Sequence, residues 1–237
     1  MKHSGLPSEK DYLPHIAYDS VVFGFSGETL QILVIKYRNT GLYALPGGFV
    51  RKNEDLDSAV RRGLKERTGL NNIYLEQFHT FGSMERHMPE VMKMILESGG
   101  SDLPEDYWML RRFISIAYYA LINHRDVNLA PDMLSDHIDW YDIDKLPPLM
   151  LDHAGIVSGA LESLRNHLDS HLAGRNLLPQ KFTMNELQQV YEAILGDNLR
   201  RTSFQRKMLG LGILRRHGKK YSGNAHKAPY LYSFSEE

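Results

Sequence analysis

The stretch from Gly48 to Leu70 constrains the fold of this chain more than any other part of it. Glycine, glutamate, arginine and leucine stand there at set intervals, at Gly48, Glu54, Arg62, Leu64, Glu66, Gly69 and Leu70. Agreement at that many fixed positions rarely arises by chance. The stretch therefore indicates a particular fold rather than a generic mixture of helix and strand.

The hydrophobic pattern changes period in and around this stretch, as expected of a mixed α/β domain. One face of a helix is predicted by the spacing of Leu56, Ala59, Val60, Gly63 and Leu64. Gly69 is expected to end that helix as its C-cap. Runs rich in Val, Ile and aromatic residues predict strands at residues 15–25, 30–37, 42–50, 73–82 and 113–122, and a strand that runs into a turn at 138–147.

The pattern resembles the Nudix box, G-x5-E-x7-R-E-U-x-E-E-x-G-U, in which U is aliphatic. The resemblance implies the Nudix fold, an α/β/α sandwich, here over residues 1–150. Two positions depart from the box, because Gly63 replaces the glutamate after Arg62, and Arg67 replaces the second glutamate of the E-E pair. Enzymes that carry the intact box hydrolyse pyrophosphates, and several carboxylates of the box hold the magnesium ions that this reaction needs.

Only Glu66 remains of that carboxylate cluster, and Arg67 adds a cation that repels a metal ion. We therefore expect no catalytic residues, no metal and no other cofactor, and a chain that is not an enzyme. Glu66 is expected to pair with Arg62 four residues earlier on the helix. The alternative is an active, magnesium-dependent Nudix pyrophosphohydrolase with a nucleic-acid-binding appendage.

Charge is distributed unevenly along the chain, although the net charge of the whole is only -1. Nine Lys/Arg and two Glu give residues 198–237 a charge of +7, which leaves -8 on the rest. Such asymmetry favours a basic surface that binds an anionic partner. Because Leu, Ile, Phe and Tyr are interleaved with these charges, the segment is expected to fold.

Residues 179–237 carry the pattern of a winged helix-turn-helix domain. Thr183 and Glu186 form the signature of a capping box at the start of one helix. A second helix follows the break at 196–198, with an apolar face of Phe204, Met208 and Leu211. Residues 213–217 and 230–234 are expected to form the two strands of a basic wing.

This order of elements favours DNA over the alternatives of RNA or a protein partner. Helix residues would contact base edges and wing cations would neutralise phosphates. The expected DNA-binding residues are Arg200, Arg201, Thr202, Ser203, Gln205, Arg206, Lys207, Arg216, Lys219, Lys220 and Lys227. Residues 151–178 are interpreted as a connecting helix followed by a Gly/Pro-containing linker at 171–180.

A Nudix domain with a degenerate box followed by a winged helix resembles the Nudix-related transcriptional regulators of the NrtR/AraR type. The segment 149–165 is similar to the family's connecting motif through Leu149, Asp152, His153 and Ile156, and 198–214 to its recognition helix. The resemblance implies a homodimer on palindromic operator DNA. It also implies an effector in the Nudix domain, either ADP-ribose or a pentose such as arabinose.

A pentose is the first expectation for the effector, and ADP-ribose the alternative. Asp19 lies within an apolar strand and Lys36 ends another, so both are expected either to face the ligand or to pair with each other. Phe23, Tyr43 and Trp108 would wall a small sugar pocket. Arg111 and Arg112 would clamp the diphosphate of ADP-ribose. The Met-rich residues 83–111 are expected to form an insertion near this ligand-binding face.

Composition is compatible with these predictions. The chain has 42% hydrophobic and 24% charged residues, and no cysteine for disulfides or zinc ligation. Neither a secretory signal nor an apolar run of membrane-spanning length is evident. A cytoplasmic protein is expected.

Overall fold

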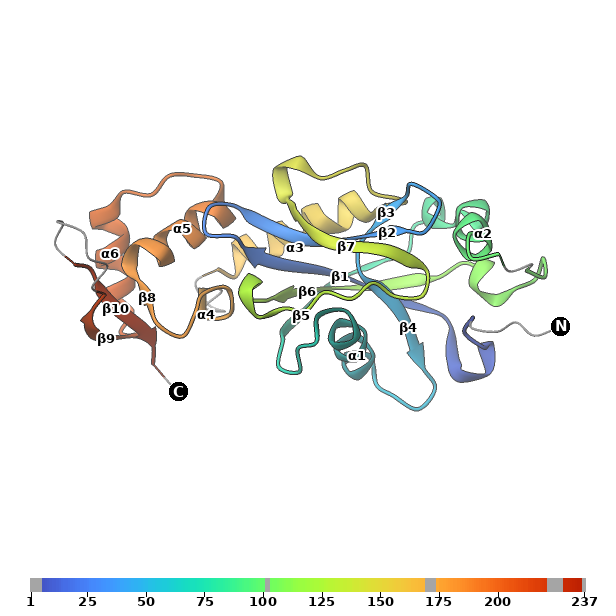
Figure 1. Cartoon of the computed structure of the whole chain (residues 1–237), viewed down its shortest axis with the longest axis horizontal. Coiled ribbons are helices and arrows are strands. Elements are labelled where there is room, and N and C mark those ends of the chain that lie inside the picture. The colour runs from blue at the N-terminus through green and yellow to red at the C-terminus, as the bar shows by residue number, and fades with distance from the viewer. Residues whose placement is uncertain (1–5, 101–102, 169–173, 221–227, 236–237) are drawn as a thin grey trace.

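Helices cover both faces of a seven-stranded sheet, which forms the larger part of the molecule (Figure 1). The computed structural model describes residues 6–100, 103–168, 174–220 and 228–235. The strands follow the order β3-β2-β1-β6-β5, with β4 paired to β1 and β7 to β2. Their bounds are β1 Tyr12–Phe25, β2 Leu30–Tyr37, β3 Tyr43–Ala44, β4 Gly47–Arg51, β5 Tyr74–Phe81, β6 Ile114–Leu121 and β7 Ser135–Asp142.

The two faces of this sheet belong to two different cores. Successive side chains of a strand point to opposite faces, so Tyr18 and Val22 of β1 pack with α1 (Leu56–Thr68). Val21 and Phe23 pack with α3 (His153–Asn166) on the other face. This arrangement confirms the predicted α/β/α sandwich.

The box helix α1 begins and ends as its sequence predicts. Asp55 caps the N-terminus by accepting a hydrogen bond from the Ser58 amide, and Gly69 ends the helix with φ 75°. That left-handed conformation is accessible to glycine at no steric cost. Val60 and Leu64 are buried, and burial of each such side chain contributes about 1.5–3 kcal/mol.

The predicted winged helix lies beyond one end of the sheet (Figure 1). The capping box of Thr183 and Glu186 is present, and Gly196 ends the helix that it starts. The elements are β8 Phe182–Thr183, α5 Met184–Leu195, α6 Arg201–Gly210, β9 Leu214–Lys219 and β10 Tyr230–Phe234. One expectation was wrong: α6 ends at Gly210, so Leu211 lies outside the buried face of Phe204 and Met208 and is 44% exposed.

The segment between the two parts of the molecule is packed rather than loose. The predicted linker at 171–180 instead contains a short helix, α4 Gly174–Leu177, and residues 171–173 lie outside the described residues. Leu177 and Leu178 are buried in a core that also holds residues of the sheet, α3 and α5. Apolar contact therefore continues from the Nudix sheet into the winged helix. The domain limits at 150 and 178 stay predictions.

Two further segments were predicted only in outline, namely the end of the strand near residue 142 and the insertion at 83–111. The strand β7 ends at Asp142, and a 3-10 helix at Ile143–Lys145 follows where the sequence predicts a turn. The segment 83–111 contains the 3-10 helices Met84–Arg86 and Trp108–Leu110 and the helix α2 Pro89–Glu97. In the described part of the chain, no helix has the length and apolar character that crossing a membrane requires.

Candidate functional site

A cavity of about 510 Å³ lies between the box helix α1 and the segment 83–111. This segment contributes Arg86, His87, Met88, Pro89, Met92, Met109, Leu110 and Arg111 to its walls, which agrees with the expected position near a ligand-binding face. Four arginines and three carboxylates line the cavity, namely Arg62, Arg67, Arg86, Arg111, Asp19, Glu66 and Asp132. The cavity therefore combines charged side chains with an apolar wall that includes Tyr12, Phe49 and Phe113.

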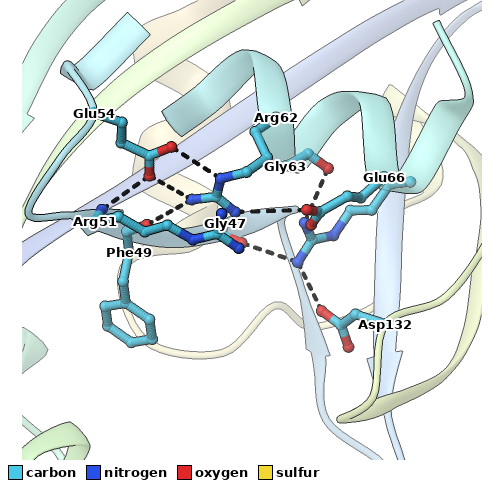
Figure 2. Close-up of polar contacts among 9 residues, drawn as sticks. Gly47, Phe49, Arg51, Glu54, Arg62, Gly63, Glu66 and Asp132 are labelled. Carbon is cyan, nitrogen blue, oxygen red and sulfur yellow. Dashed lines mark hydrogen bonds and ion pairs between the residues drawn. The ribbon is translucent and has the colours of Figure 1, made fainter. Parts of the chain in front are cut away.

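Arg62, on the box helix α1, is held by Glu54 and Phe49 from the first part of the box (Figure 2). Its guanidinium donates two hydrogen bonds to the Glu54 carboxylate, at 2.6 and 3.0 Å, and a third to the Phe49 carbonyl oxygen at 3.2 Å. The hydrogen bond from Arg62 lowers the pKa of Glu54. Glu66 lies 3.7 Å from Arg62, so the expected ion pair is present, although Glu54 is the closer partner.

Arg67 is the most buried of the box cations, at 8% exposure. Its guanidinium donates to the carbonyl oxygens of Gly63 and Gly47, at 3.1 and 3.0 Å, and to Asp132 at 2.7 Å. The dashed lines that reach Gly47, Gly63 and Asp132 in Figure 2 are these bonds. Arg67 thus ties α1 to β4 and to the loop before β7.

A second buried network joins the cavity to the start of α3. Arg86 bonds to Asp19 at 3.0 Å and to Asp152 at 2.9 Å, while its own side chain is only 8% exposed. Ser115 donates a hydrogen bond to the same Asp19 carboxylate at 2.6 Å. The imidazole of His153 lies 3.7 Å from Asp19.

The imidazole of His153 also has a structural role at this network. Its Nδ1 accepts a hydrogen bond from the Leu45 amide at 3.0 Å, which requires Nδ1 to be unprotonated. Burial lowers the pKa of His153, an effect that Arg86 reinforces and that Asp19 and Asp152 oppose. The neutral ring therefore joins α3 to the backbone next to the box.

Only some of the residues predicted to bind the effector line this cavity. Asp19 and Arg111 line the cavity. Phe23 has no exposed surface and packs edge-on against Tyr119 in the α3 core, so it is no pocket wall. The Arg112 guanidinium donates to the Gly82 carbonyl oxygen instead of facing the cavity.

The expected pair of Asp19 and Lys36 is wrong. Lys36 lies opposite Tyr43 and His137 in the sheet, and its ammonium group is 5.8 Å from the Tyr43 ring. Asp19 pairs instead with Arg86. Neither Lys36 nor Tyr43 lines the cavity.

Trp108 packs against aromatic residues that line the cavity but does not itself line it. It stacks on Tyr12 and packs edge-on against Phe49, with ring centroids 5.6 and 4.9 Å apart. Phe49 and Tyr12 themselves line the cavity, whereas Trp108 does not.

Sequence reasoning missed four cavity residues as ligand-facing groups: Arg62, Arg67, Arg86 and His153. Arg67 was marked by its departure from the box, and His153 by the connecting motif. Arg86 had no signal, because it lies in a short 3-10 helix just before α2, in a segment that the sequence marks only as a long insertion.

The predicted DNA-binding residues that the structure describes lie at α6 and the wing of the winged helix. Arg200, Arg201, Thr202, Ser203, Arg206 and Lys207 are exposed, and Gln205 is half-buried. On the wing, Arg216 and Lys219 lie 4.5 and 5.7 Å from the Tyr230 ring. Lys220 pairs with Glu186 at 3.0 Å. Lys227 lies outside the described residues.

Comparison with known proteins covers both parts of the chain. Residues 13–158 match the family profile described as the NUDIX domain, and residues 174–234 match the NrtR DNA-binding winged helix domain. The ADPR responsive transcriptional repressor NtrR of Acinetobacter baylyi is 30% identical over 208 residues, which are 85% of this chain and 74% of that protein.

Solved structures show the same arrangement of the whole chain. The crystal structure of Shewanella oneidensis NrtR has a TM-score of 0.71 and 26% identity, covering 93% of this chain and 94% of that one. The same protein complexed with a 27mer DNA has a TM-score of 0.71 and 25% identity, covering 93% of each chain. An ADP-ribose pyrophosphatase of Methanocaldococcus jannaschii is 27% identical over 161 residues, 66% of this chain and 79% of that protein.

Proposed function

The chain belongs to the NrtR family of Nudix-related winged-helix regulators, and we propose that it regulates transcription in response to a ligand of the ADP-ribose class. In this proposal the ligand occupies the cavity beside α1, and the winged helix binds duplex operator DNA. The observation that carries the proposal is the cavity with four arginines, joined through α3 to a basic winged helix.

Two observations favour ADP-ribose over the pentose that the sequence suggested. The relative from Acinetobacter baylyi is described as responsive to ADPR. The cavity, at about 510 Å³, lies within the range of about 300–1,000 Å³ typical of small-molecule sites, and four arginines line it. A pentose is neutral and accepts only ordinary hydrogen bonds from arginine, whereas a diphosphate binds guanidinium groups through stronger charge-assisted hydrogen bonds.

The helix α3 is the proposed route from the ligand to DNA. Its N-terminus begins at the network of Asp19, Arg86 and Asp152. Arg86 also lines the cavity, so a ligand phosphate would compete with the two carboxylates for its guanidinium. A change in those bonds would alter the position of the start of α3.

The other end of α3 contacts the winged helix directly. Arg165 near its C-terminus donates a hydrogen bond to the Ile194 carbonyl oxygen at the end of α5, at 2.7 Å. Ile156, Val157, Ala160 and Leu164 share one core with residues of α5, including Leu187, Val190 and Ile194. Packed interiors transmit displacement because they leave few voids. Movement of α3 would therefore reorient α5 and, with it, the adjacent α6.

Operator DNA is the proposed partner of α6 and the wing. Exposed Arg201 and Arg206 on α6 are placed for base edges and nearby phosphates, and Lys219 on the wing is placed for phosphates. A homodimer is proposed because two copies of α6 related by a two-fold axis would match a palindromic site. The spacing of the two helices is then the quantity that the ligand changes.

A thermal-shift screen tests the choice of ligand. ADP-ribose, ADP, L-arabinose and other pentoses are added in turn to the full chain. A ligand that binds only the native state stabilises it by about 2.7 kcal/mol at 100 times its Kd, so ADP-ribose is expected to raise Tm and arabinose to leave it unchanged. A shift with arabinose alone would refute the assignment and restore the pentose expectation.

The hydrolase alternative rests on the similarity to an ADP-ribose pyrophosphatase. It predicts turnover of ADP-ribose with magnesium, which Glu66→Gln would abolish. We expect no release of AMP or ribose phosphate above the rate without protein. Magnesium-dependent turnover that disappears in Glu66→Gln would make the chain an enzyme as well as a regulator.

A further inference from the structure

A tyrosine lies against the position at which the Nudix box has a glutamate and this chain has Gly63. The Tyr18 hydroxyl lies so close to Gly63 that a Cβ at that position would collide with it, and a Cβ at Gly48 would lie 2.6 Å from the same oxygen. Tyr18 is 2% exposed and belongs to the core under α1. A glutamate at 63 would therefore require the buried Tyr18 side chain to move.

The remaining carboxylates of the box do not suit a magnesium ion. Glu54 is engaged by two hydrogen bonds from Arg62, and the Glu66 side chain is 58% exposed. In the described part of the chain, no three His, Asp or Glu side chains converge as a metal site would require. Magnesium needs near-octahedral oxygen ligands, and the donors present do not fit it.

The oxygen atoms beside Gly63 accept hydrogen bonds from a guanidinium group instead of binding a metal ion. Arg67 binds the carbonyl oxygens of Gly63 and Gly47 and the carboxylate of Asp132. These are the kinds of oxygen that ligate a hard cation. Arginine remains charged at any physiological pH, so its charge is permanent and needs no ion from solution.

We propose that the Arg67 guanidinium takes the place of the Nudix metal and makes diphosphate binding independent of divalent cations. This inference rests on the proposed function, since it assumes a ligand with a diphosphate. Arg67 lines the cavity, and its buried Nε has no hydrogen-bond partner among the described residues. A guanidinium has five N–H donors, so donors remain for a phosphate oxygen after the three protein bonds.

Calorimetry of ADP-ribose binding to the full chain tests the proposal. The titration is run once with EDTA and once with excess magnesium, and the two Kd values are expected to agree within about twofold, because a permanent charge replaces the ion. Binding that requires magnesium would overturn the inference and leave the proposed function intact. If ADP-ribose binds under neither condition, the proposed effector and this inference both fail.

Variants at Arg67 separate a role in ligand binding from a role in folding. Arg67→Gln is expected to weaken ADP-ribose binding by on the order of tenfold or more, since a charge-assisted hydrogen bond is lost. Arg67→Lys keeps the charge and is expected to lose less. Binding to operator DNA without ligand serves as the folding control. A folded Arg67→Gln variant with unchanged ligand affinity would overturn the inference.

A manganese titration tests the site without any ligand. Electron paramagnetic resonance reports free Mn²⁺, and the wild-type chain is expected to leave this signal unchanged at micromolar metal. Glu66→Gln is the matched control, because an ion bound at the box would need that carboxylate. Manganese bound by the wild type but not by Glu66→Gln would overturn the inference, whatever the effector.

Discussion

Three of the four cavity arginines, Arg62, Arg67 and Arg86, lie in an environment opposite to that of the arginines on α6. Arg62, Arg67 and Arg86 are each bonded to a carboxylate of the protein, at 2.6, 2.7 and 3.0 Å respectively. Arg201 and Arg206 on α6 are exposed, and among the described residues no acidic partner lies within ion-pair distance of them.

The difference separates two uses of the same side chain. A buried, paired guanidinium fixes the geometry of its surroundings, and its loss leaves an uncompensated charge. An exposed, unpaired guanidinium is available to a polyanion, and its contribution depends on salt. Substitution of a paired cavity arginine should therefore change the stability of the fold and the affinity for ligand. Substitution of an α6 arginine should change only the affinity for DNA.

The largest effect is expected at Arg86. Arg86→Met removes the cation from two carboxylates, one of which, Asp19, has a side chain only 10% exposed. Breaking a buried pair by removing one partner costs about 3–5 kcal/mol. Urea denaturation measures this loss, and Arg111→Met, at the more exposed pair with Glu9, is the control. Equal, small losses in both variants would show that Arg86 is not a buried anchor.

Arg206→Ala should leave stability unchanged and weaken operator binding. The loss expected for a side chain that contacts a base is about 1–3 kcal/mol, and it should be greater for the operator than for random duplex. Fluorescence anisotropy with a labelled operator measures it. Lys65→Ala, which removes an exposed cation from α1, is the matched control. Unchanged affinity for the operator would remove α6 from the DNA-binding surface.

Acidification should destabilise the cavity side of the molecule through His153. Burial lowers the pKa of its imidazole in the folded chain, whereas the unfolded chain titrates near ~6.5. Below that value the unfolded state binds a proton that the folded state resists, so stability falls as pH falls. His153→Asn keeps an acceptor for the Leu45 amide, and its urea midpoint should fall less between pH 7 and 5. An identical pH profile would contradict this role.

The smallest effect is expected on the wing. Lys219→Ala should weaken binding to any duplex by a similar modest factor and reduce the salt slope by about 1. The measurement is the operator Kd at several salt concentrations, compared with that of random DNA. A loss confined to the operator would mean that Lys219 contacts a base rather than a phosphate.

Much of the fold was predictable because its signals are local. The capping box of Thr183 and Glu186 and the cap at Gly69 depend only on nearby residues. The error at Leu211 concerns a helix end, which is decided by the chain that follows. The burial of Leu177 and Leu178 could not be inferred, because it depends on contact with a sheet distant in sequence.

The cavity was less predictable, because its charges are paired over long sequence separations. Asp19 stood out as a charge in an apolar strand, but its partner Arg86 lies 67 residues away in the long segment 83–111, whose position in space the sequence does not predict. The aromatic character of Phe23 alone does not make it a pocket wall. Phe23 shares a face of β1 with Asp19, which lines the cavity, but it lies four residues farther along the strand and packs against Tyr119 in the α3 core.

One measurement tests the central claim most directly, namely that a ligand in the Nudix cavity controls DNA binding by the winged helix. A duplex selected from a random pool by the full chain serves as operator, and its Kd is measured with increasing ADP-ribose or L-arabinose. The account predicts that ADP-ribose changes the Kd, that arabinose does not, and that Arg67→Gln requires more ADP-ribose for the same change. An operator affinity that is unaffected by saturating ADP-ribose would contradict it.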